Sequence, residues 1–394
     1  MLSGEVMRVL FVTSLLGREY GGAEISTGLL LDRLADDGHW VRALTTRKAR
    51  SDPRLVSVSF PVEVPKRVLT VGNGSVDFLL ARKVRRQLEI FKPDVAHVQD
   101  TYILPAAVAA AKQLHVPVVV TVRNNVLDSA WDMMFGFPFA GMLKRRNKTI
   151  IAALHGADRV ISVSRYIKGE LVTRGVDAEK IVPIYNLPPT VKNADAQATL
   201  GGGAVHLFAP GFLAGFKGFR PLILAMKRVC ASCADVDLTI VGGGPQRKTL
   251  QKLSSELGLS GKVRFVGKVP FADVLPLYAA CDVVVFPSIY PEPLGRVTLD
   301  AMYFGKPVVA SRVGGIPEVV TDQETGILVP PDNPEALANA IITLAENPDL
   351  RASMGRKGKE AVHEKFNPEK IVGQHLQVYR DAMMDCGCGS ECQI

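Results

Sequence analysis

The feature that most constrains the fold is an alternation of short, β-branched apolar runs with longer segments of helical period. In the first half the runs are MRVLFVTSL, VRALTT, DVAHVQD, VPVVVTV and ADRVISVS. In the second half they are AVHLFAP, DLTIVGGG, KVRFVGKV, CDVVVFPS, KPVVASRV and TGILVPP. Such runs are typical of buried strands, and strands that alternate with helices build right-handed βαβ units around a parallel sheet. The sequence therefore predicts an α/β fold with two doubly wound, Rossmann-like domains.

The alternation is interrupted once, at residues 186–203, which are polar and rich in Pro, Gly and Ala. A chain of 394 residues is also too long for one core and suits two domains of about 150 to 200 residues. We expect an N-terminal domain over 1–185, a linker over 186–203, a C-terminal domain over 204–364, a further helix over 365–385 and a disordered tail over 386–394. The active site is expected in the cleft where the carboxyl ends of both sheets face each other.

Charge and hydropathy limit the cellular setting. Residues 1–185 hold 26 Lys and Arg against 18 Asp and Glu, whereas residues 186–394 hold 21 of each, so the net charge of +8 belongs to the first half. No run of 18 apolar residues is present, and the apolar start of the chain is short enough to be a first buried strand. We expect a cytoplasmic protein.

The six cysteines lack the dense spacing of a disulfide framework, so we expect reduced thiols. No cluster of His, Asp and Cys has the spacing of a metal site, and we expect neither a metal nor a cofactor. The only DxD triplet, Asp235–Asp237, precedes its strand and should face away from the cleft. Nucleic acid is not an expected partner, because no stacking platform or known module is present.

The stretch PSIYPEPLGRVTLDAM, residues 287–302, places Glu292 and Asp300 across a loop that leads into a helix. If this helix starts near Gly295, its first amides lack intrahelical partners and point into the cleft. A nucleotide sugar suits this set, with sugar hydroxyls on one acid, diphosphate on the amides and the ribose diol on the other acid. The alternative is that Arg296 and Asp300 form an i,i+4 pair on a solvated helix face.

Two further strand-end loops support an anion site in the second domain. The turn GGGP at residues 242–245 precedes a helix near Gln246, a geometry that suits an anion but also occurs as an ordinary turn. The loop GFLAGFKGF supplies Lys217, whose ammonium could balance a diphosphate leaving group. No GxGxxG or Walker motif is present, so the standard dinucleotide and NTPase sites are not supported.

In combination, these motifs resemble the family 4 retaining glycosyltransferases of the GT-B architecture. The likeness runs from GGAE after the first strand, through ADRVISVS, VGGGP, FVGKV and PEPLGRVTLDAM, to GGIPEVV and TGILVPP. The stretch that contains Glu292 and Asp300 is similar to the family's Glu-x7-Glu signature, with Asp in the second position. The resemblance implies metal-independent transfer of a sugar from a nucleotide-diphosphate sugar such as a UDP- or GDP-sugar, and a C-terminal helix that crosses back to the first domain.

The resemblance also assigns roles to residues. It implies Glu292 and Lys217 as catalytic groups, with Glu292 on the donor sugar and Lys217 on the diphosphate. The implied donor-binding residues are Gly22, Gly243, Gly244, Pro245, Arg247, Lys268, Val269, Leu294, Gly295, Arg296, Val297 and Asp300. The implied acceptor-side residues are Glu24, Asp100, Arg123 and Asn124.

Three positions depart from the family pattern. Phe212 stands where members commonly have an Arg, so diphosphate binding must depend on Lys217, the helix amides and Arg247 or Arg296. Arg123 stands where many members have a His, and an Arg cannot act as a general base. Asp300 is one methylene shorter than the usual Glu, which shifts its reach. No general base can be assigned.

The acceptor is expected on the basic first domain. Residues 81–88 are basic, and residues 131–148 place Trp, Met and Phe side chains directly before a Lys and Arg cluster. This pattern favours an anionic membrane surface and a glycan or lipid-linked acceptor, and hence a peripheral location at the inner face of the cell membrane. A flap over the cleft, followed by a solvated basic helix, is the alternative.

Two rival functions remain compatible with these residues. A nucleotide-sugar epimerase of the same architecture would change the donor without an acceptor. A non-catalytic partner subunit would bind a nucleotide sugar without turnover, which the departures at Phe212 and Arg123 allow.

Overall fold

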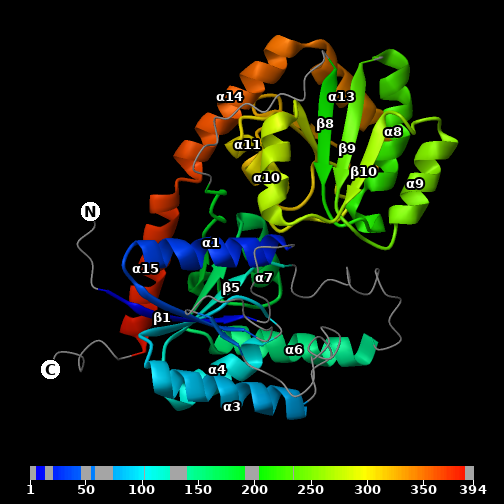
Figure 1. Cartoon of the computed structure of the whole chain (residues 1–394). Coiled ribbons are helices and arrows are strands. Elements are labelled where there is room, and N and C mark those ends of the chain that lie inside the picture. The colour runs from blue at the N-terminus through cyan, green and yellow to red at the C-terminus, as the bar shows by residue number, and fades with distance from the viewer. Residues whose placement is uncertain are drawn as a thin grey trace.

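The computed structural model describes residues 6–13, 21–45, 55–57, 74–101, 103–124, 140–190, 204–233 and 235–386. Two parallel sheets, each flanked by helices, form two domains that lie one above the other in Figure 1. The prediction of a two-domain α/β fold of the GT-B type is confirmed. The predicted linker falls largely outside the described residues, as does most of the predicted tail.

The first sheet has the order β3-β2-β1-β4-β5-β6-β7, with every neighbouring pair parallel. Its strands are β1 (Arg8–Thr13), β2 (Trp40–Thr45), β3 (Leu55–Ser57), β4 (Val95–Val98), β5 (Val118–Val122), β6 (Arg159–Ser162) and β7 (Ile181–Pro183). Its helices are α1 (Gly22–Asp36), α3 (Gly74–Phe91), α4 (Leu104–Gln113), α6 (Ala140–Gly156) and α7 (Arg165–Thr173). Every residue of β4 and β5 is buried, as expected for central strands covered on both faces.

The second sheet has the order β10-β9-β8-β11-β12-β13 and is also parallel throughout. Its strands are β8 (Val205–Pro210), β9 (Val236–Val241), β10 (Val263–Gly267), β11 (Val283–Phe286), β12 (Val308–Ser311) and β13 (Gly326–Val329). Its helices are α8 (Phe219–Ser232), α9 (Arg247–Glu256), α10 (Phe271–Ala280), α11 (Arg296–Tyr303), α12 (Ile316–Val319), α13 (Pro334–Glu346) and α14 (Pro348–Lys365). The strand order reverses between β8 and β11, which is where ligands bind in sheets of this kind.

The last helix, α15 (Pro368–Asp385), returns to the first domain, where it contacts α1, β4, β5 and β6. In Figure 1 it continues from α14 down along the side of the first sheet. Its buried Tyr379 hydroxyl lies 2.7 Å from Nδ1 of His97 on β4, so a polar contact as well as apolar packing holds it there. The prediction that this helix crosses back is confirmed.

Candidate active site

Glu292 and Lys217 meet at the carboxyl edge of the second sheet. Glu292 follows β11 and is only 7% exposed, and Lys217 comes from the short 3-10 turn after β8. The Glu292 Oε1 atom accepts hydrogen bonds from Lys217 Nζ and Ser288 Oγ, each at 2.5 Å. A carboxylate this deeply buried requires such partners, because an unpaired buried charge is strongly destabilising. The structure therefore brings both predicted catalytic residues together.

Two glycines allow neighbouring loops to pack against the Glu292 loop. Gly314 has a φ of +53°, and a Cβ atom there would lie 2.2 Å from the carbonyl oxygen of Glu292. Gly218 has a φ of +70°, and its Cβ would lie 1.8 Å from the carbonyl oxygen of Pro287. Gly315, which follows Gly314 in the chain, donates its N–H to the Glu292 carbonyl at 2.7 Å. Backbone contacts from two loops thus fix the main chain of the Glu292 loop.

Helix α11 begins directly after this loop. Gly295 is its N-cap with a φ of +85°, and no side chain caps the helix. The first N–H groups of a helix have no intrahelical acceptor and carry the positive end of the helix dipole. The predicted helix start near Gly295 is therefore the observed one, and the helix begins four residues after Glu292 in the chain.

Asp300 does not lie on a solvated helix face. It is 2% exposed, and its Oδ1 lies 3.1 Å from Arg296 Nη2, although this ion pair lacks the alignment of a hydrogen bond. Burial raises the pKa of Asp300 to about 6, against the opposing effect of the Arg296 charge. The alternative of an exposed i,i+4 pair was wrong, since both side chains are enclosed at the domain boundary.

Arg296 joins the two domains. Its Nη1 donates to Ser26 Oγ on α1 at 3.0 Å and to the Leu187 carbonyl at 3.2 Å. Its side-chain stem also packs on Gly22, where an added Cβ would lie 3.7 Å from Arg296 Cδ. The predicted GGAE loop and the start of α11 are thus in direct contact at the domain boundary.

The predicted glycine turn packs against the Lys217 loop. The Leu213 N–H donates to the Gly243 carbonyl at 2.9 Å, and a Cβ on Gly244 would lie 2.3 Å from the Leu213 carbonyl oxygen. Arg247, on the following helix, lies close to Gly267 at the end of β10. Among the other predicted donor-binding residues near this turn, Pro245 and Lys268 are exposed and Val269 is half-buried. Near the start of α11, Leu294 is buried and Val297 is half-buried.

Arg123 stands at the centre of a buried polar network in the first domain. Its Nε and Nη2 donate to Gln99 Oε1 at 3.2 and 2.9 Å, and its Nη1 donates to Asn186 Oδ1. Gln99 in turn contacts His97 at 2.9 Å and accepts from Thr27 Oγ1 at 3.2 Å. Burial and the charge of Arg296 lower the pKa of Arg123 to about 9, which leaves it cationic at neutral pH.

The other predicted acceptor-side residues lie after β4, after β5 and at the start of α1. Asp100 follows β4 and accepts from the N–H of Ile103 at 3.3 Å, Asn124 is exposed after β5, and Glu24 is half-buried in the first turn of α1. Within the segment 131–148, residues 131–139 lie outside the described residues, and residues 140–148 form the start of α6.

Sequence reasoning missed several polar partners in this site, among them Ser288, Gln99, Asn186 and Ser26. Ser288 sits four residues before Glu292 and could have been suspected from that spacing. The other three contact residues 24 to 270 positions away, so nothing in the local sequence indicates them.

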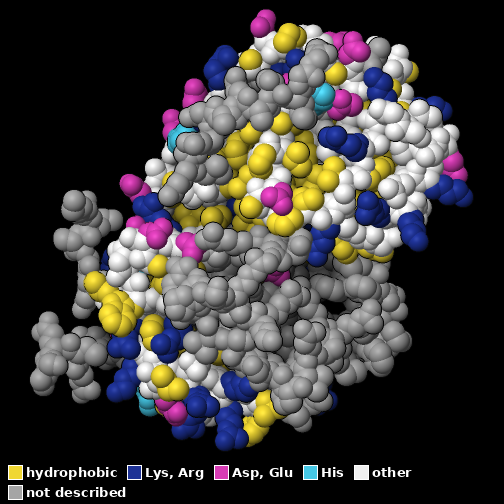
Figure 2. Space-filling view, viewed as in Figure 1, with side chains coloured by type: hydrophobic (Ala, Val, Ile, Leu, Met, Phe, Trp, Pro, Cys, Tyr) yellow, Lys and Arg dark blue, Asp and Glu magenta, His cyan; other side chains and the backbone are white. Residues whose placement is uncertain are grey.

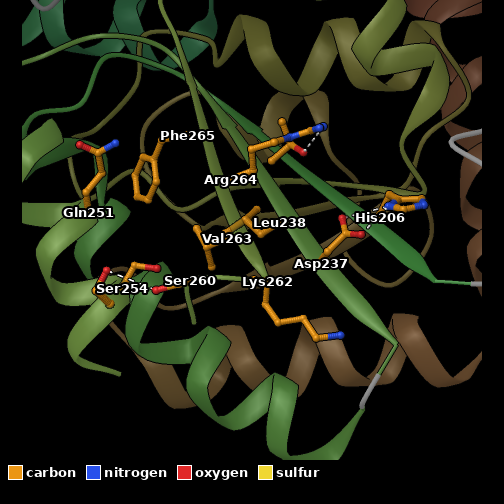
Figure 3. Close-up of a pocket in the computed structure, with 13 residues that line it drawn as sticks. His206, Asp237, Leu238, Gln251, Ser254, Ser260, Lys262, Val263, Arg264 and Phe265 are labelled. Atoms are coloured by element: carbon orange, nitrogen blue, oxygen red, sulfur yellow. Dashed lines mark hydrogen bonds and ion pairs between the residues drawn. The ribbon is translucent and has the colours of Figure 1, made fainter. Parts of the chain in front are cut away.

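A separate groove of about 760 Å³ lies at the starts of β8, β9 and β10, at the edge of the sheet opposite the cleft (Figure 3). His206 Nδ1 and Asp237 Oδ2 lie 2.8 Å apart on its wall. The DxD triplet thus faces away from the Glu292 site, as expected. Among the described residues, no group of three or more His, Cys, Asp or Glu side chains could hold a metal ion.

Comparisons with known proteins agree with this architecture. The family described as "Glycosyltransferase Family 4" matches residues 20–187, and the family described as "Glycosyl transferases group 1" matches residues 200–361. The phosphatidyl-myo-inositol mannosyltransferase of Mycolicibacterium smegmatis is 27% identical over 382 residues, 95% of this chain and 93% of that protein. The N-acetyl-alpha-D-glucosaminyl L-malate synthase of Bacillus anthracis is 27% identical over 385 residues, 93% of this chain and 95% of its own length.

Among solved structures, the sucrose-phosphate synthase of Thermosynechococcus elongatus superimposes with a TM-score of 0.80 at 25% identity. The match covers 96% of this chain and 100% of that one. Both domains, the order of their strands and the two family matches lead to the same conclusion: the chain belongs to the group 1 glycosyltransferases, with a first domain of the family 4 type.

Proposed function

We propose that this glycosyltransferase moves a sugar from a nucleotide-diphosphate sugar, such as a UDP- or GDP-sugar, to a hydroxyl of an anionic acceptor. In this proposal the anomeric configuration is retained and no metal takes part. The observation that carries it is the Lys217–Glu292 pair beside the uncapped start of α11. In this arrangement the Glu292 carboxylate can bind sugar hydroxyls, and the Lys217 ammonium and the free N–H groups of α11 can bind a diphosphate.

The donor is bound in this proposal by residues of the second domain. Glu292 accepts hydrogen bonds from hydroxyls of the donor sugar, and Lys217 shares its ammonium between Glu292 and the diphosphate. The backbone at Lys268 and Val269 contacts the base. The Asp300 carboxylate accepts hydrogen bonds from the ribose hydroxyls, in addition to its ion pair with Arg296.

During transfer, the bond between the anomeric carbon and the diphosphate oxygen breaks as the acceptor oxygen bonds to the same face of the sugar. The diphosphate takes up the electron pair of the broken bond. The proton of the acceptor hydroxyl passes to an oxygen of the leaving diphosphate. Lys217 and the α11 amides stabilise the growing negative charge, which is the usual largest contribution to such catalysis.

The acceptor is anionic, and lipid-linked, in this proposal. Two relatives that match over more than 90% of their length carry phosphatidyl-myo-inositol and L-malate in their names, and both are anionic compounds. On α3 of the first domain, Phe78 is 69% exposed, and Arg82, Arg85 and Arg86 are exposed with it. Figure 2 shows Lys and Arg side chains gathered at this end of the first domain. This surface suits peripheral contact with an anionic membrane.

Membrane contact in this proposal is peripheral. In the part of the chain that the structure describes, no helix is both long enough and apolar enough to span a bilayer.

A calorimetric screen of UDP-, GDP- and ADP-sugars tests the donor, followed by turnover with the sugar nucleotide that binds. Glu292→Gln should lower turnover by about a hundredfold or more, because the carboxylate that binds the sugar and pairs with Lys217 becomes neutral. The same change at exposed Glu335 is the matched control and should leave turnover unchanged.

Full activity of Glu292→Gln, with an unchanged melting temperature, would refute the site. Release of an altered sugar from the donor alone would indicate an epimerase instead. Donor binding without turnover on any acceptor would indicate the non-catalytic subunit.

A further inference from the structure

Two guanidinium groups, one from each domain, bind neighbouring residues at the domain boundary. Arg123 lies at the end of β5, and Arg296 is the first residue of α11. They hold adjacent residues of the segment after β7, because Arg123 donates to the Asn186 side chain and Arg296 to the Leu187 carbonyl. The charge of Arg296 also contributes to the lowered pKa of Arg123, in agreement with their contacts to adjacent residues.

The hydrogen-bonding capacity of Arg296 is not filled. Its side chain is only 9% exposed, and among the described residues its Nε has no hydrogen-bond partner, while its Nη2 has the ion pair with Asp300 alone. Oδ1 of Asp300 likewise has an ion pair but no hydrogen bond. Buried polar atoms are nearly always paired, so the unpaired Nε leaves Arg296 with capacity for one further hydrogen bond, which a ligand or an ordered water can complete when the side chain moves.

The local charge is positive. Arg123 is held by the neutral amides of Gln99 and Asn186, and the one carboxylate joined to either cation in the described residues is Asp300. The first turn of α1 lies against the Arg296 stem, and the first turn of α11 begins at Arg296 itself. Both helix starts add partial positive charge.

We propose that Arg296 and Arg123 together bind the anionic group of the acceptor, a phosphate or a carboxylate. The inference rests on the proposed transfer to an anionic acceptor, and it assigns a binding site to the anionic group of that acceptor. Guanidinium groups suit planar, bidentate contact with either oxyanion. Arg296 reaches away from its own domain, to α1 and to the segment after β7, so it lies on the acceptor side of the cleft. Because each domain supplies one cation, the site is complete only when the domains are in this arrangement.

The test titrates inorganic phosphate into the full-length protein by calorimetry, with the donor site saturated by UDP or GDP. Wild-type protein should bind phosphate under these conditions. Arg296→Gln and Arg123→Gln should each weaken that binding about tenfold or more, since each removes a charge-assisted hydrogen-bond donor. Arg228→Gln removes the same charge from an exposed position on α8 and should have no effect.

Asp300→Asn separates loss of an anion ligand from damage to the fold, because the proposal predicts tighter phosphate binding for this variant and a damaged fold would give weaker binding. It removes the competing carboxylate, so it should bind phosphate several-fold more tightly than wild-type protein. Arg296→Lys should lie between wild type and Arg296→Gln, because an ammonium keeps the charge but loses the planar fork.

Three outcomes would overturn the inference. The first is no phosphate binding by wild-type protein, and the second is equal binding by the Arg296 and Arg228 variants. The third is displacement of phosphate by the nucleotide one for one, which would assign the anion to the donor's diphosphate. If neither nucleotide binds, the proposed donor chemistry fails separately, and titration without nucleotide still tests the two arginines.

Discussion

Asp300 shows how burial in this site changes the chemistry of a single residue. An ordinary Asp is ionised above pH 4, but here burial raises the pKa to about 6 even with Arg296 beside it. The folded protein therefore holds this proton more tightly than the unfolded chain does. Ionisation of Asp300 then opposes folding, and its cost is present above about pH 6 and absent below about pH 4.

Asp300→Asn should remove this pH dependence. As the pH rises from 4 to 7, the melting temperature of the wild-type protein should fall relative to that of the variant. The pKa difference corresponds to about 3 kcal/mol at most. Thermal unfolding of both proteins at pH 4.5, 6 and 7.5 measures the change. A difference that stays constant across this range would show that Asp300 has an ordinary pKa.

At the scale of elements, one helix of the first domain is capped from the second. The Ser164 hydroxyl caps α7 at Ile167 N and also donates to the Pro293 carbonyl at 2.5 Å, next to Glu292. The Glu318 carboxylate, on α12, accepts from the N–H groups of Arg165 and Tyr166 at 2.9 and 2.8 Å. A carboxylate at a helix N-terminus accepts hydrogen bonds from the free N–H groups of the helix and interacts favourably with the positive end of the helix dipole. The loops that hold Glu292 are thus tied to the first domain.

Glu318→Ala should loosen this connection. We expect a loss of about 1 to 2 kcal/mol of stability, the usual cost of a lost N-terminal cap, and a lower turnover with little change in donor affinity. Melting temperature, turnover and calorimetric donor binding measure the three quantities. Glu335→Ala, which removes an exposed carboxylate from α13, is the control. Unchanged turnover in Glu318→Ala would show that the contact is structural only.

The elements that the sequence predicted are those whose signal is local. Central strands such as β5 and β11 are continuous apolar runs, and the start of α11 follows from Gly295. The short edge strands β3 and β7, three residues each, were missed because so few residues show no period. The burial of Asp300 and the contact of Arg296 with Ser26 could not be predicted either. They depend on how two domains pack, and the partners are 270 residues apart.

At the scale of the whole molecule, the site depends on the chain closing on itself. Helix α15 leaves the second domain and packs on the first, where Tyr379 contacts His97. His97 contacts Gln99, and Gln99 accepts from Arg123 at the cleft. Burial lowers the pKa of His97 well below its usual value, so it is neutral in the folded protein. One continuous polar network therefore runs from the returning helix to the residues proposed to bind the acceptor.

The uneven charge of the molecule gives a prediction about membranes. The whole surplus of +8 belongs to residues 1–185, and the exposed face of α3 combines Arg82 and Arg86 with Phe78. We expect the protein to float with vesicles that contain phosphatidylglycerol and not with neutral phosphatidylcholine vesicles. Replacing Arg82 and Arg86 by Gln should weaken binding by roughly thirtyfold, at about 1 kcal/mol for each basic residue near the surface.

The matched control replaces Arg228 and Arg356, which are exposed on the second domain, and changes the net charge by the same amount. It should float as wild-type protein does, because these residues lie away from the α3 face. High salt should release the wild-type protein, since surface charges more than a Debye length apart are screened. Equal losses in the two double variants would show that net charge, and not the α3 face, drives the binding. If wild-type protein stays unbound to anionic vesicles at low salt, the acceptor must be reached without a membrane surface.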